Sequence, residues 1–112
     1  MSYDKDMDAT FQALASSTRR EMLDVINREP GIPVGQLASH FDVSRIAVMK
    51  HLAVLENADL VASQKEGRVR RLYFNAVPIR MIYERWSDEY SDHWSGVVTD
   101  LKARAESRGS DD

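Results

Sequence analysis

The sequence has no cysteine among its 112 residues. This absence excludes disulfides, thiolate metal sites and a cysteine nucleophile, and it fits a reducing compartment. The chain also has no apolar run near the roughly 18 residues that a membrane helix requires. Its acidic opening, MSYDKDMD, contains no apolar segment and is not a signal peptide by pattern. We therefore expect one cytoplasmic domain with no membrane partner.

The chain lacks the positive net charge that is usual in DNA-binding proteins, because its formal charge is −3 at pH 7. The distribution of charge is more informative than the sum. Residues 44–71 hold six positive and three negative side chains, so this segment carries +3 and the remainder carries −6. A basic patch can attract nucleic acid, and acidic tails can limit non-specific binding.

Residues 44–57 carry the pattern on which the functional prediction depends. Ser44 is a good N-cap, because its hydroxyl can accept a free backbone N–H of the first turn. Apolar side chains then follow at steps of four and three, as on one face of a helix, and they are Val48, Leu52 and Leu55. Cationic and slender side chains lie opposite, namely Arg45, Met49 and Lys50. A helix that reads the major groove needs this arrangement.

Shorter helices precede this one. The apolar spacing and the Pro/Gly interruptions predict helices over residues 8–15, 18–28 and 33–43. Thr18 and Glu21 have the spacing of a capping box at the start of the second, and Pro33 occupies a favoured first-turn position in the third. Helix, tight turn and helix at this spacing predict a helix-turn-helix.

A β-hairpin follows, with strands at 61–65 and 68–75 around a turn at Glu66-Gly67. Basic residues crowd its tip, namely Lys65, Arg68, Arg70 and Arg71. A basic hairpin directly after a recognition helix can reach backbone phosphates or the minor groove. The fold class expected is therefore mostly α with a small β-hairpin, a winged helix-turn-helix.

Pro78 is expected to start a long last helix within residues 76–105. Its apolar and aromatic side chains form nearly a heptad seam, made of Ile79, Tyr83, Trp86, Tyr90, Trp94, Val97 and Leu101. This seam is too rich for one small domain to cover, so we expect a homodimer interface there, with help from Phe11 and Leu14. The single domain then has a core with wing at 8–75, a dimerisation helix at 76–105, and disordered ends at 1–7 and 106–112.

The order of these motifs resembles the ArsR/SmtB family of bacterial winged-helix repressors over roughly residues 8–75. The similar runs are FQALASSTRREMLDVI, VGQLASHFDVSRIAVMKHLAVLENADLV and KEGRVRRLYF. The resemblance implies a homodimer that binds double-stranded DNA at a two-fold operator and blocks transcription. Family members commonly release DNA when an inducer binds, so an unidentified small-molecule inducer is among the implied partners.

The usual inducer in the family is a metal, and here the sequence departs from the pattern. Pro33 and Gly35 stand where metalloid sensors have paired cysteines, and neither can bind a metal. The last helix offers a single histidine, His93, beside carboxylates, which is a poor transition-metal site. We expect no metal and no cofactor, as in a metal-independent branch of the family.

Several alternatives stay open at this point. Met49 has two equal interpretations, contact with base edges or packing on the preceding helix, and His51 is a secondary candidate because histidines there are more often structural. The aromatic last helix could hold a metal or small molecule that releases DNA. The fold could also dock a protein. No paired carboxylates suggest catalysis, so an enzyme is not expected.

Overall fold

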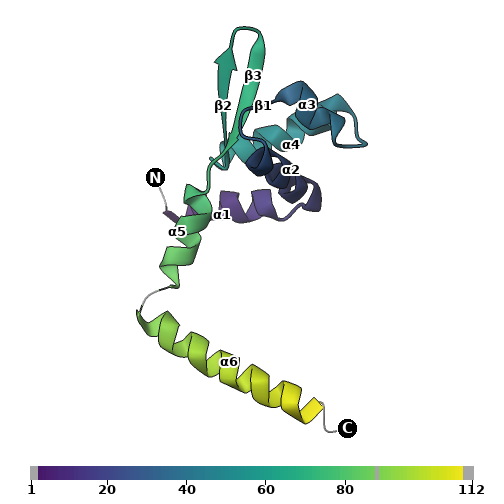
Figure 1. The fold of residues 1–112 in the computed structure, drawn as a ribbon. Helices are drawn as coiled ribbons and strands as arrows, with labels where there is room; N and C mark the ends of the chain where they lie inside the picture. Colours follow the sequence, from purple (N-terminus) through teal and green to yellow (C-terminus); the bar gives the residue numbers. More distant parts are fainter. Residues whose placement is uncertain (1–2, 88, 110–112) are drawn as a thin grey trace. The chain divides into compact units, whose positions relative to one another are not determined.

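The computed structural model describes residues 3–87 and 89–109, with side chains in 6–87 and 96–106. The chain divides into two compact units, Met1–Ile79 and Arg80–Asp112. In the first unit, the β2–β3 hairpin extends beyond the helices (Figure 1). The elements in order are α1 (Tyr3–Leu14), α2 (Ser17–Arg28), β1 (Ile32–Pro33), α3 (Val34–Ser39), α4 (Arg45–Asn57), β2 (Val61–Glu66), β3 (Val69–Phe74), α5 (Val77–Arg85) and α6 (Glu89–Gly109). Over the described residues, this confirms the expected mostly α winged helix-turn-helix fold.

One hydrophobic core joins α2, α3, α4 and the sheet. The helix α4 packs on it through the stripe expected from the sequence, since Val48, Leu52 and Leu55 are at most 1% exposed. Fully buried side chains of the neighbouring elements surround this stripe, namely Met22, Ile26, Leu37, Leu60 and Leu72. Burial of each such side chain contributes about 1.5–3 kcal/mol. The inner face therefore sets the rotation of α4 about its axis and leaves its outer face to solvent.

Both ends of α4 are closed by local hydrogen bonds. The Ser44 hydroxyl accepts the Ala47 N–H at 3.1 Å, as expected for the N-cap. At the other end, Asp59 has a positive φ of 59°, its N–H donates to the Glu56 carbonyl at 2.9 Å, and the Leu60 N–H donates to the Leu55 carbonyl at 3.0 Å. This pair of bonds is a Schellman motif. The residues Ala58-Asp59-Leu60-Val61 thus end α4 and lead into β2.

The sheet has three strands in the order β1-β3-β2, one more than the sequence predicted. Ile32 and Pro33 pair with Leu72 and Arg71 of β3. These two residues therefore form a strand and an N-cap, so α3 begins at Val34 and ends at Ser39 instead of running over 33–43. The hairpin turn is Gly67-Arg68, one residue later than the predicted Glu66-Gly67, because Glu66 still pairs with Val69. Gly67 has a positive φ of 64° within this turn.

The first two helices differ from the prediction at their starts. The helix α1 begins at Tyr3, not at residue 8, and Met7 is buried, so residues 3–7 are helical where disorder was expected. The capping box of Thr18 and Glu21 is wrong, because α2 already includes Ser17. The N-cap is Ser16, whose hydroxyl accepts the Arg19 N–H at 3.3 Å.

The last part of the chain forms two helices, not the expected single one. The helix α5 ends at Arg85 and α6 begins at Glu89. Ser87 lies between them, and serine competes for backbone hydrogen bonds at helix ends. The aromatic seam is therefore divided between α5, the turn at Trp86 and α6. The side chains of Tyr90 and Trp94 lie outside the described residues. None of the helices in the described ranges is long and apolar enough to span a bilayer.

Candidate nucleic-acid interface

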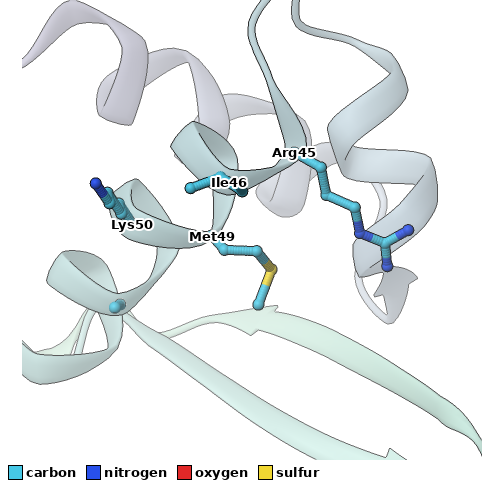
Figure 2. Close-up of a pocket in the computed structure, with 5 residues that line it drawn as sticks. Arg45, Ile46, Met49 and Lys50 are labelled. Atoms are coloured by element: carbon cyan, nitrogen blue, oxygen red, sulfur yellow. The ribbon is translucent and has the colours of Figure 1, made fainter.

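The outer face of α4 is a shallow hollow of about 480 Å³. Figure 2 shows that its side chains fan out from the first turns of the helix in different directions. The lining combines two cations with three apolar side chains, namely Arg45, Lys50, Ile46, Met49 and Ala53. Arg45, Met49 and Lys50 were predicted for this face, and the structure brings them together there. Arg45 and Lys50 are exposed, whereas Met49 is half-buried and packs partly against the core.

The same face carries little negative charge. The helix α4 contains one acidic residue, Glu56, and this carboxylate forms an ion pair with Arg70 of β3. Arg45 and Lys50 near the start of the helix have no ion-pair partner among the described residues. A cationic face with its one acid neutralised suits a polyanionic partner.

His51 lies on the inner side of α4 and takes part in a structural contact. Its Nδ1 is 3.3 Å from a guanidinium nitrogen of Arg19. The same guanidinium donates to the carbonyls of Gln12 and Ala13 at the end of α1, each at 2.8 Å. Arg19 thus links α1 to the recognition helix, and His51 accepts from it with its lone pair. This geometry favours the structural interpretation of His51 over contact with a base.

The four basic residues of the hairpin divide into two pairs. Lys65 and Arg68 are exposed at the tip, and neither has an ion-pair partner within the described chain. Arg71 pairs with Glu66 at 2.7 Å and donates to the Gly31 carbonyl at 3.0 Å, and Arg70 pairs with Glu56. Lys65 and Arg68 are therefore the residues most available to a phosphate, while Arg70 and Arg71 are held by the protein itself.

Sequence reasoning missed Ile46, whose side chain is 71% exposed on the outer face of α4. A signal for it was present. Ile46 precedes Lys50 by four residues, which places both on one side of a helix, and it lies opposite the buried stripe. An isoleucine on the polar side of an amphipathic helix is a departure from the pattern that can be read from the sequence alone.

The residues predicted for a dimer interface are mostly exposed. Two aromatic side chains stand out, because Tyr83 is 70% and Trp86 is 59% exposed. Leu14 is half-buried and contributes to the core, and five further predicted or neighbouring apolar side chains are exposed, namely Phe11, Ile79, Val97, Val98 and Leu101. Within the described residues no group of acids and histidines could hold a metal. The side chain of His93 lies outside them.

The fold contains three helices around one core, followed by a basic β-hairpin that is bonded to the third of them, α4. This arrangement defines the class of winged helix-turn-helix proteins. A family of helix-turn-helix domains matches residues 14–64.

Similarity to known proteins identifies the family within this class. The chain is 39% identical over 85 residues to YuzN of Bacillus subtilis, an uncharacterised HTH-type transcriptional regulator, and the match covers 70% of this chain and 92% of that one. It is 29% identical over 62 residues to the transcriptional repressor SdpR of the same organism, a match that covers 55% and 68% of the two chains. A crystal structure of an ArsR family transcriptional regulator superposes with a TM-score of 0.69 and 32% identity, over 84% of this chain and 95% of that chain. This chain belongs to the ArsR family of winged helix-turn-helix transcriptional regulators, whose members bind DNA.

Proposed function

We propose that this regulator is a homodimeric repressor that reads a two-fold operator. The N-terminal half of α4 enters the major groove of each half-site, and the β2–β3 wing lies on the flanking backbone or in the minor groove. Half-sites are then separated by about 10 base pairs or a multiple of it. The observation that carries the proposal is the outer face of α4, where Arg45 and Lys50 flank apolar side chains on a helix fixed by the core.

The wing supports the same orientation. Its two exposed tip cations, Lys65 and Arg68, are suited to phosphate oxygens, which carry no sequence information but fix the register of the protein on the duplex. The backbone N–H groups of residues 44–46 lie at the start of α4, where helix N-termini favour a phosphate, whereas the Ala47 N–H is bonded to the Ser44 hydroxyl. Base edges in the major groove are then contacted by α4.

The proposed dimer rests on the exposed apolar side chains of α1, α5 and α6. Tyr83 and Trp86 are more than half exposed in the single chain, and aromatic side chains are enriched in the buried centres of interfaces. Two copies of the chain can cover them and also supply the symmetry that a two-fold operator requires. Repression is supported by the similarity to SdpR, which is named as a repressor.

The test is fluorescence anisotropy of the full chain on duplex DNA from upstream of its own gene, with scrambled DNA as the control. We expect binding that discriminates against the scramble and weakens steeply with salt. Arg45→Ala and Lys50→Ala should weaken binding by about ten-fold or more, because each removes a contact worth about 1–3 kcal/mol. Lys102→Ala removes an equal charge from α6 and should bind like the parent. If Arg45→Ala and Lys50→Ala bind the duplex as tightly as Lys102→Ala and the parent, α4 does not contact the operator.

A second function has a specific observation in its favour. Tyr83 and Trp86 are exposed aromatics that could contribute to a site for a small molecule or metal that releases DNA. Zinc, nickel and arsenite added to the preformed complex test the metal arm directly. Release of DNA by one of them would establish a sensor, and stable complexes with all three would leave the metal-independent repressor.

A further inference from the structure

Ile46 occupies an unusual position for a large apolar side chain. It is the second residue of α4, it is 71% exposed, and no other large hydrophobic side chain described in Met1–Ile79 is exposed to the same extent. It is neither a member of the hydrophobic core nor packed against it. The residues that surround Ile46 in the hollow suggest a reason for its exposure.

The hollow places Ile46 between two cations. Arg45 precedes it, Lys50 lies one turn further on, and Ala53 is small enough to leave space at the far side. In Figure 2, Arg45 and Lys50 point to opposite sides of the helix, with Ile46 between them. An apolar centre with a cationic rim fits a surface that is apolar in the middle and anionic at both edges. A DNA major groove has this character where a thymine lies between the two phosphate backbones.

Thymine carries the one apolar group on the standard base edges of the major groove, the 5-methyl group. A β-branched aliphatic side chain suits it, because it is apolar and stiff about χ1. Met49 is the other apolar candidate in this hollow, but it is half-buried and packs partly against the core. Ile46 is therefore the more exposed of the two apolar candidates and the more accessible to a bound duplex.

We propose that Ile46 determines specificity by packing on the 5-methyl group of one thymine in each half-site of the operator. This inference rests on the proposed function, since it requires α4 to lie in the major groove. It adds a chemical requirement to that function: the half-site contains a thymine whose methyl group, and not only whose hydrogen-bonding edge, is read.

The experiment replaces thymine by deoxyuridine, which removes the methyl group and leaves base pairing unchanged. The purified full chain first selects a binding site from a randomised duplex pool. Each thymine of that site, with its symmetry mate, is then replaced by deoxyuridine, and affinity is measured by anisotropy. We expect one symmetric pair of positions at which affinity falls about four-fold for one half-site and about fifteen-fold for both, the effect of about one methyl group each.

The protein variants identify which side chain reads the methyl group. Ile46→Ala should bind the thymine duplex more weakly and should no longer distinguish it from the deoxyuridine duplex, and Ile46→Val should show an intermediate effect. Val54→Ala trims another partly exposed aliphatic side chain of α4 and should keep the full methyl dependence. This arrangement is a double-mutant cycle between side chain and methyl group.

Two outcomes overturn the inference and leave the proposed function standing. One is selection of a specific site at which no deoxyuridine replacement changes affinity. The other is an Ile46→Ala variant with the same methyl dependence as the parent, which would assign the methyl contact to Met49 or the exposed isoleucine to a protein partner. Failure to select any site from the pool would overturn the proposed function together with the inference.

Discussion

Arg70 of β3 and Glu56 of α4 form an ion pair that joins the wing to the recognition helix. Their side chains are 36% and 26% exposed, so the pair is partly open to solvent. Glu56 is the one acid of α4. We therefore expect Arg70 to act chiefly by neutralising a carboxylate that would otherwise repel phosphates, without a phosphate contact of its own.

Arg70→Ala should weaken binding several-fold to specific and scrambled DNA alike, because it leaves Glu56 uncompensated near the duplex. The double variant Arg70→Ala with Glu56→Gln should recover most of the affinity. Anisotropy of both variants and of Glu56→Gln alone completes the cycle. No recovery in the double variant would show that Arg70 contacts DNA itself.

Arg68→Ala should act differently, since Arg68 is exposed at the hairpin tip without an ion-pair partner among the described side chains. We expect affinity to fall for all sequences and the slope of log K against log salt to flatten by about 0.9 for each phosphate that the protein no longer neutralises, counted twice in a dimer. Lys65→Ala should behave likewise, and Lys102→Ala is the control for net charge. A slope equal to that of the parent would show that the hairpin tip does not touch the duplex.

Tyr83→Asp combined with Trp86→Asp should convert the dimer to monomers, because two charges would be buried in an apolar interface. Sedimentation velocity at several protein concentrations measures the change. Ile46→Asp places a carboxylate on an equally exposed position of α4 and should leave the dimer intact. Persistence of the dimer in the double variant would contradict the assignment of α5 to the interface.

Arg19→Ala should destabilise the fold by about 1–3 kcal/mol, because one partly buried guanidinium serves two carbonyls of α1 and contacts His51 of α4. Arg19→Lys should not restore the stability, since a single ammonium cannot reproduce the fork of donors. Urea unfolding at one fixed protein concentration gives the difference, and fixed concentration matters for a dimer. Arg20→Ala removes a single exposed bond to Leu14 and is the matched control.

Sequence reasoning placed α4 almost to the residue, because its signals are local: a serine cap and an apolar stripe of helical spacing. It did not find β1, since a strand of two residues has no periodicity and exists only through pairing with Leu72 and Arg71. The N-cap of α2 was misplaced because Ser16, Ser17 and Thr18 are equally suitable locally, and the contacts of Arg19 with α1 favour the first.

In the candidate site, too, local features could be predicted from the sequence, and features that depend on distant contacts could not. Arg45, Met49 and Lys50 follow from helical spacing, which is enough to group them on one face. Helical spacing cannot reveal that Arg70 is held in an ion pair while Arg68 is exposed, because the partner of Arg70 is Glu56, 14 positions away in the chain. Ile46 was within reach of the sequence and was missed because the charges on either side of it dominate the pattern.

The strand β1 has a consequence for the kind of DNA that is selected. It pairs with β3 of the wing and continues at once into α3 of the helix-turn-helix, so strand pairing links the wing directly to the helix-turn-helix. We therefore expect the wing to keep its position relative to α4 when the proposed complex with DNA forms. The duplex would then deform to fit the protein, and pyrimidine–purine steps such as TA bend most readily. We expect operators to favour such steps at base pairs that no side chain touches.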